Sequence, residues 1–273
     1  MGTIKHLLTI VLTFALFISP KLFGQETEAT QEQPQHFITM TTVHWNPAPG
    51  TDFSDWMKTE KEYFDKVTSK NNYIKGSAVL THYFTGDNSE LKLISMYDSW
   101  GDIEKAEAEN QKLIQAAWPD EAERTAFLQK QRSYYSSRHN DEIYTDMPFH
   151  KDMAELPKEP VVVYLKTNDL SFNPEGKVDN FKQYSEKVIN KNPLIKAYYT
   201  HRHAWGSNGT EMLEVFIFDH FGDIEKSFEE NDKLAAAAWP DEAERTNFMK
   251  DMGKLFTGQH GDYIYHNVPE LQK

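Results

Sequence analysis

The alternation of hydrophobic and polar residues divides residues 36–147 into six elements. Segments rich in β-branched and aromatic residues are typical of strands, and they alternate with segments whose apolar residues recur at helical spacing. The expected elements are a strand His36–Trp45, a helix Asp52–Lys70, strands Ile74–Thr85 and Leu91–Tyr97, a helical region from Gly101 and a strand Glu142–Met147. Their order, β-α-β-β-α-β, is that of a split βαβ unit.

The second half of the chain repeats this pattern. Gly101–Tyr144 aligns without a gap to Gly222–Tyr265 at an offset of 121 residues, and 24 of the 44 aligned residues are identical. The expected elements of the second copy are a strand Val161–Thr167, a helix Val178–Asn190, a hairpin Ile195–Asp219, helices from Gly222 and a strand Asp262–Asn267. A repeat of this length is a domain, so the chain should contain two similar folds in tandem.

The N-terminus has the features of a bacterial export signal. Lys5 precedes an apolar run from Leu7 to Ser19, which is too short to span a bilayer comfortably and is followed by a polar tract. An uncleaved membrane anchor is the alternative. We expect cleavage near Gly24, no stable membrane insertion afterwards, and a periplasmic or secreted protein. The predicted organisation is a signal peptide 1–24, a polar tail 25–35, a first repeat 36–147, a linker 148–160 and a second repeat 161–273.

A sheet of the split βαβ type has helices on one face only, so its other face needs a cover. Two tandem copies can supply that cover for each other. The element order and the duplication resemble the dimeric α/β-barrel superfamily in its fused form, which implies an α+β fold of two ferredoxin-like βαββαβ repeats packed sheet to sheet as a pseudo-dimeric barrel. Members include haem-dependent chlorite dismutases and dye-decolourising peroxidases, monooxygenases, isomerases and binding proteins. The resemblance therefore implies a fold more than an activity.

Composition narrows the classes of partner. The chain carries 42 acidic and 29 basic residues, a formal charge of −13, so we expect no nucleic-acid partner. The chain has no Cys, which excludes disulfides and thiol catalysis. Aromatic residues make up 13% of the chain, which suits either large cores or an apolar ligand cavity.

The duplicated block Trp118–Arg124, repeated as Trp239–Arg245, favours a structural interpretation. Pro119 and the acids after it are typical of the start of a helix, and Trp118 would pack across the bend. Asp120 and Arg124 are spaced to form a surface ion pair. The functional alternative makes Trp118 and Trp239 walls of two equivalent ligand pockets.

The strand histidines are candidates for chemistry. His82 and its counterpart His203, with His201 and Trp205 in the same row, would line the space between the sheets, where His82 and His203 would face one another. Glu214, on the neighbouring strand, could enter that space. Such groups can bind a transition metal or transfer protons near neutral pH, so His203 and Glu214 are the candidate catalytic residues. The alternative is a hydrogen-bonded His on a half-exposed face.

A second duplicated pair is His139-x-Asp141 and His260-x-Asp262, expected between the long helices and the last strands. A His near a helix C-terminus and an Asp in a turn have structural uses. Alternatively, each His is a ligand or general base at a pocket mouth near Tyr144 or Tyr265. The candidate metal ligands are therefore His203, His139 and His260, and haem would need an axial ligand, usually a His, for which His203 and His260 are candidates.

Two functional hypotheses follow. The favoured one is a secreted or periplasmic protein that binds a small apolar or aromatic molecule. The alternative is a monooxygenase-, peroxidase- or isomerase-like enzyme that uses strand histidines, with a metal or haem as candidate cofactor. A homo-oligomer formed through exposed sheet edges is a third, weaker option. The predicted ligand-binding residues are His82, His201, His203, Trp118, Trp239, Trp205, Tyr144 and Tyr265.

Overall fold

Eight antiparallel strands close into one barrel in the computed structural model, which describes residues 35–172 and 174–273. The predicted signal peptide and nearly all of the predicted polar tail lie outside the described residues. Around the barrel the strand order is β1-β3-β2-β8-β5-β7-β6-β4. None of the helices in the described part of the chain combines the length and apolar character that crossing a bilayer requires.

Each repeat supplies four consecutive strands of the barrel. Repeat one consists of β1 (Phe37–Trp45), α1 (Phe53–Lys66), β2 (Gly76–Phe84), β3 (Glu90–Tyr97), α2 (Trp100–Ala117), α3 (Glu121–Arg132) and β4 (Tyr135–Asp146). Repeat two consists of β5 (Val162–Leu170), α4 (Val178–Lys187), β6 (Ala197–Trp205), β7 (Glu211–Phe218), α5 (Gly222–Ala238), α6 (Glu242–Gly253) and β8 (Phe256–Asn267).

Two strand pairs join the repeats and close the barrel. At one seam His82 of β2 lies opposite Tyr265 of β8, and at the other His203 of β6 lies opposite Tyr144 of β4. The two seams are equivalent, because each residue of one corresponds to a residue of the other at the offset of 121. The predicted fold, an α+β pseudo-dimeric barrel of two ferredoxin-like repeats, is confirmed.

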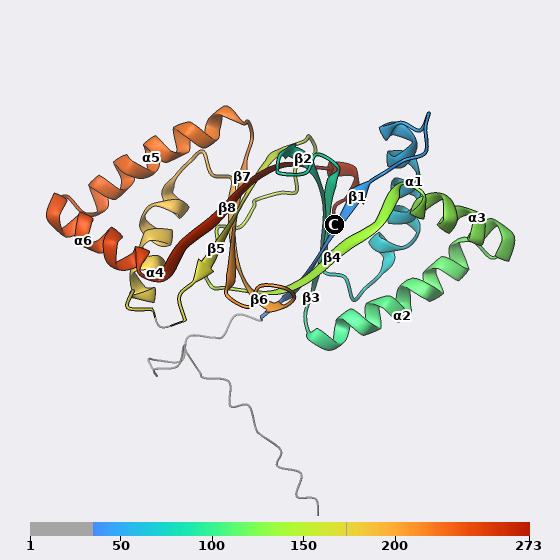
Figure 1. Cartoon of the computed structure of the whole chain (residues 1–273), viewed down its shortest axis with the longest axis horizontal. Coiled ribbons are helices and arrows are strands. Elements are labelled where there is room, and N and C mark those ends of the chain that lie inside the picture. Colours follow the sequence, from blue (N-terminus) through green and yellow to red (C-terminus); the bar gives the residue numbers. More distant parts are fainter. Residues whose placement is uncertain (1–34, 173) are drawn as a thin grey trace, which may run out of the picture. The chain divides into compact units, whose positions relative to one another are not determined.

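Side chains on the two faces of the strands build separate cores. The inward-facing residues of both repeats form one apolar cluster, which includes Ile38, Leu80 and Leu213. Helices α1–α3 cover the outer face of the repeat-one strands, and α4–α6 cover the outer face of the repeat-two strands (Figure 1). The helix-side core of repeat two is rich in aromatic residues, with Tyr164, Tyr198 and Phe218 among its buried members.

The last strand of each repeat is longer than predicted. β4 begins at Tyr135 and β8 at Phe256, and their backbones pair with β1 and β5. The prediction missed these starts because their residues are mostly polar. His139 and His260 therefore lie within strands, and the predicted turn positions for them are wrong.

The first strands of the two repeats are related by a different offset. The strand registers make Thr39 equivalent to Tyr164, because Thr39 lies opposite Ser95 and Tyr164 lies opposite Phe216. The offset falls from 125 back to 121 across the first helix, because α4 has 10 residues where α1 has 14. Near the C-terminal end of the first strand, the offset of 125 makes His44 equivalent to Asp169.

Candidate functional site

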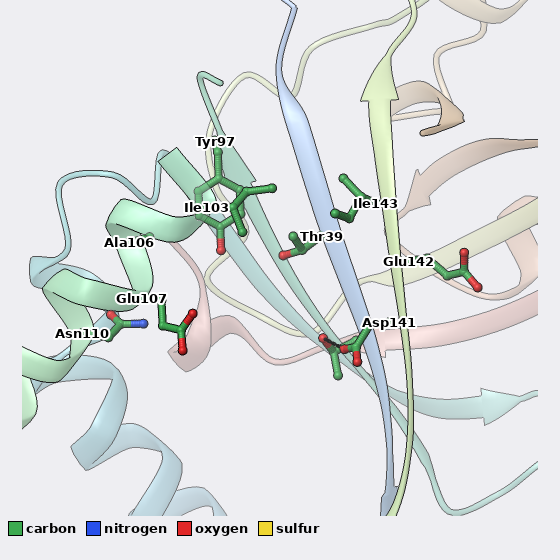
Figure 2. Close-up of a pocket in the computed structure, with 10 residues that line it drawn as sticks. Thr39, Tyr97, Ile103, Ala106, Glu107, Asn110, Asp141, Glu142 and Ile143 are labelled. Atoms are coloured by element: carbon green, nitrogen blue, oxygen red, sulfur yellow. Dashed lines mark hydrogen bonds between the residues drawn. The ribbon is translucent and has the colours of Figure 1, made fainter. Parts of the chain in front are cut away.

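A cleft of about 260 Å³ lies on the helix side of repeat one, between α2 and strands β1 and β4. Helix α2 contributes one wall, and the strands contribute the other (Figure 2). Its lining residues are Thr39, Thr41, Tyr97, Ile103, Ala106, Glu107, Asn110, Asp141, Glu142 and Ile143. The Glu142 side chain points away from the other lining residues in Figure 2, as expected from its alternation with Asp141 and Ile143 along β4.

A buried asparagine holds the α2 wall in place. The Asn71 side chain is fully buried, and its Nδ2 donates to the Ala106 carbonyl at 2.8 Å and to Asn110 Oδ1 at 2.7 Å. The Asn110 carbonyl oxygen is therefore already bonded, which leaves its amide nitrogen free to face the cleft. Asn192 makes the same bond to Asn231 in repeat two, so this support is structural and common to both repeats.

The carboxylate of Asp141 is engaged by the protein itself. Thr41 Oγ1 donates to Asp141 Oδ1 at 2.7 Å, and His139 Nε2 lies 3.2 Å from Asp141 Oδ2. These groups are exposed, so the contacts fix the orientation of Asp141 at the rim more than they stabilise the fold.

The equivalent region of repeat two is filled by aromatic side chains. Tyr164 stands where Thr39 does, and Phe228 stands where Glu107 does. The Tyr164 ring stacks on Phe216 at 5.5 Å and contacts Phe228 edge-on at 6.4 Å. Its hydroxyl donates to Asp262 Oδ1 at 2.5 Å. The carboxylate equivalent to Asp141 therefore has a hydrogen-bond donor within repeat two. The cleft of repeat one exists because these two large side chains are absent from it.

Inside the barrel, polar side chains gather near the two seams. The side chains of His203 and Glu142 are 8% and 9% exposed, and His203 Nε2 lies 3.3 Å from Glu142 Oε2 without hydrogen-bond alignment. Glu142 also accepts hydrogen bonds from the backbone N–H of Ser207 and from its hydroxyl at 2.8 Å. This arrangement could serve either as a buried ion pair that joins β4 to β6 or as an acid–base pair.

The remaining inward acids are bonded to tyrosines and a lysine. Tyr144 donates to Glu211 Oε1 at 2.6 Å, and Tyr265 donates to Glu90. Burial raises the pKa of the Glu211 carboxyl, and the bond from Tyr144 opposes that rise. Lys92 donates to Thr42 Oγ1 at 2.9 Å and lies 3.6 Å from Glu90; burial lowers its pKa, and the nearby Glu90 carboxylate acts in the opposite direction.

The predicted meeting of Glu214 with His203 is wrong. Glu214 lies opposite Thr200, and residues opposite one another in a sheet point to the same side, so Glu214 faces the helices. There it accepts hydrogen bonds from Tyr198 at 2.7 Å and Asn168 at 2.8 Å. Glu90, Glu142 and Glu211 face the lumen instead, as does Asp169, which lies opposite Glu211.

The other residues of the predicted histidine row are separated. His82 Nδ1 lies 2.8 Å from Thr85 Oγ1, and His201 Nδ1 lies 3.2 Å from Asp146 Oδ1. No hydrogen bond or ion pair joins His82 to His203 among the described residues, because the two occupy different seams. Trp205 is 67% exposed at the end of β6.

Trp118 and Trp239 are packed between helices instead of lining an open pocket. Each ring centre lies 4.0 Å from that of a phenylalanine of the following helix, Phe127 or Phe248. Arg124 Nη1 donates to the Trp118 carbonyl at 2.9 Å, and Asp120 caps helix α3 by accepting from the Glu123 N–H. The expected surface ion pair between Asp120 and Arg124 is therefore replaced by two backbone contacts.

The candidate metal ligands do not come together. His139 and His260 are about half exposed, each near the Asp two residues on, and His203 lies at the β4–β6 seam. The described residues contain no group of three or more His, Asp or Glu side chains placed to hold a metal ion.

The histidines predicted as axial haem ligands do not stand over an apolar slot in the described part of the chain, as histidine-ligated haem would need. His203 packs against Glu142 and edge-on to Tyr144, and no histidine lines the cleft. The helix-side space of repeat two is occupied by its own aromatic side chains.

Apart from Asp141, which the sequence singled out as part of the His139-x-Asp141 pair, the residues that line the cleft were not among those predicted. Thr39, Tyr97, Glu107 and Asn110 belong to no catalytic motif. A signal was nevertheless available: in the alignment at an offset of 121, Glu107 corresponds to Phe228 and Tyr97 corresponds to Phe218. At both positions repeat one has a polar group where repeat two has only an aromatic ring, which indicates that the two copies differ in function at this place.

Comparison with known proteins places the fold but not the activity. The chain is similar to a putative monooxygenase from Lactobacillus acidophilus NCFM, with a TM-score of 0.51 and 6% identity over 87% of this chain and 95% of that one. It is similar to a putative monooxygenase from Fusobacterium nucleatum, with a TM-score of 0.51 and 10% identity over 85% and 92%. A mutant chlorite dismutase from Candidatus Nitrospira defluvii gives a TM-score of 0.51 and 8% identity over 88% and 93%.

No protein-family model matches the chain, and no curated protein matches its sequence. Identities this low show a shared fold alone. The chain has the fused dimeric α+β-barrel fold, in the form found in chlorite dismutase and in proteins described as monooxygenases. The choice between a binding protein and an enzyme must come from the site.

Proposed function

We propose that this protein binds a small organic molecule in the helix-side cleft of repeat one. The observation that carries the proposal is the contrast between the repeats. Two copies of one fold share the same support, Asn71 or Asn192, yet only repeat two fills the space with Tyr164 and Phe228. Small side chains at a position that an aromatic ring can fill leave apolar surface uncovered, and a ligand with an apolar body would cover it. Export to the periplasm or the exterior, proposed from the N-terminal sequence, would make this an extracytoplasmic function.

Filling the cleft tests the proposal. Thr39→Tyr copies the residue of repeat two and should abolish binding, while Thr39→Ser keeps both the space and the hydroxyl. The probe is 2-(4-hydroxyphenyl)ethanol, measured by saturation-transfer NMR and by titration, with circular dichroism as the check of folding. Binding to wild type and Thr39→Ser but not to folded Thr39→Tyr supports the proposal. Equal binding by Thr39→Tyr would place the ligand elsewhere.

A second candidate is acid–base catalysis at the barrel seam. It is favoured by the buried His203 Nε2, which lies near Glu142 without an aligned hydrogen bond. The fold shared with proteins described as monooxygenases and with chlorite dismutase gives this candidate its support from the comparisons. Its test is deuterium exchange next to the carbonyl of acetophenone. His203→Ala should lose any exchange that wild type catalyses, whereas His82→Ala, at the equivalent position of the other seam, should keep it.

A further inference from the structure

The Glu107 carboxylate is an unpaired acid at the rim of the cleft. No hydrogen bond or ion pair to it occurs within residues 35–172 and 174–273, whereas the nearby Glu109 pairs with Lys112 at 2.9 Å. Figure 2 shows the Glu107 side chain beside Asn110 on the α2 wall. An exposed carboxylate alone defines no site, but a second polar group without a partner lies deeper in the cleft.

That group is the hydroxyl of Tyr97. Its side chain lies in the wall of the cleft, and the residue is only 7% exposed. In Figure 2 its ring lies next to Ile103, with the hydroxyl directed into the space between α2 and β1. Among the described residues nothing bonds to this hydroxyl, and its oxygen is not among the polar atoms sealed from solvent, so a ligand in the cleft could bond to it. The equivalent residue in the filled half is Phe218, which has no hydroxyl to satisfy.

The cleft therefore has carboxylates at its rim, and the Tyr97 hydroxyl lies deeper, next to apolar side chains. Ile103, Ala106 and Ile143 supply the apolar surface. The second rim acid, Asp141, is held by Thr41 and His139, and no Lys or Arg lines the cleft. A ligand carrying a carboxylate would meet repulsion there, whereas an ammonium group would find an unpaired carboxylate. The formal charge of −13 adds a long-range attraction for cations.

We propose that the ligand of this cleft is a small organic amine, with its ammonium group at Glu107, its apolar body on Ile103 and Ile143, and a polar substituent at Tyr97. This inference rests on the proposed binding function and names the class of molecule that the cleft selects. Three of the lining positions at which the repeats differ, Thr39, Tyr97 and Glu107, then supply the space, the inner hydrogen bond and the charge.

Three probes of one shape test the selection: tyramine, the neutral 2-(4-hydroxyphenyl)ethanol and the anionic 3-(4-hydroxyphenyl)propionate. We expect tyramine to bind up to about fivefold more tightly than the neutral probe, which is the upper end of what an exposed charge pair provides. The anion should bind most weakly. The preference should shrink as salt rises from 20 to about 500 mM, because exposed charges are screened.

Variants separate this inference from the proposed function. Glu107→Gln should bind tyramine and the neutral probe equally, while Glu104→Gln, an exposed acid one turn earlier on α2 and outside the cleft, should keep the preference. Tyr97→Phe should weaken all three probes. If the neutral probe binds as tightly as tyramine to wild type, the amine inference is wrong and the binding function stands. If no probe binds, or Thr39→Tyr changes nothing, the proposed function itself is overturned.

Discussion

The Tyr144 hydroxyl donates to Glu211 Oε1 at 2.6 Å and so joins the last strand of repeat one to a strand of repeat two. The equivalent bond, from Tyr265 to Glu90, lies at the opposite seam. Tyr144 and Tyr265 are both almost fully buried, at 2% and 1% exposed. Two independent tyrosine–glutamate bonds of the same kind therefore connect the repeats inside the barrel, in addition to the backbone ladders of the seams.

Tyr144→Phe should destabilise the protein by about 1–3 kcal/mol at neutral pH, because it leaves the largely buried Glu211 carboxylate without its donor. Urea denaturation monitored by circular dichroism measures the free energy of unfolding. Tyr265→Phe provides a matched comparison at the other seam and should lose a similar amount. A loss confined to one of the two variants would mean that the seams are not energetically equivalent.

Glu211→Gln should change the pH dependence of stability. Burial raises the folded-state pKa of Glu211 above its ordinary value of 4.5, so wild type is favoured while the group is protonated. That contribution is complete below pH 4.5 and is lost as the pH rises through the folded-state pKa. Glu211→Gln should therefore gain stability relative to wild type between acidic and neutral pH. Unfolding free energies at pH 4, 5.5 and 7 measure this, and a difference that is flat or falls with pH would contradict it.

Much of the fold could be predicted because the duplication and the element order are local properties of the sequence. Gly101–Tyr144 and its copy define the repeat, and the β-α-β-β-α-β order limits how two sheets can cover each other. The strand pairs that close the barrel were not predictable individually, because the register between β2 and β8 depends on contacts between residues 185 positions apart, such as Thr81 and His266.

The site was harder to predict, for two physical reasons. Which face of a strand points inward depends on register, and an error of one residue moved Glu214 into the wrong layer. A cleft depends on missing volume, and a small residue such as Thr39 carries no signal until it is compared with Tyr164. The conspicuous residues Trp118 and Trp239, by contrast, belong to helix packing.

A glycine next to the His203–Glu142 pair provides a further test of the seam. Gly206, in the β6–β7 hairpin, has a positive φ of 139°, and a Cβ at this position would overlap the Glu142 carboxylate. Gly206→Ala should therefore destabilise the protein by more than the 1–3 kcal/mol of backbone strain alone. Gly209→Ala is the control in the same hairpin, because its φ is ordinary and nothing lies within 4 Å of the added Cβ.

A double-mutant cycle separates the overlap from the strain. Glu142→Ala removes the carboxylate that a Cβ at Gly206 would meet, so Gly206→Ala should cost less in the Glu142→Ala background than in wild type. The coupling should be at least about 1 kcal/mol, since residues in direct contact couple by 0.5–3 kcal/mol. Chemical denaturation of the four proteins at pH 7 measures it. Additive costs would show that the hairpin moves away from Glu142, and that Gly206 does not hold this carboxylate against His203.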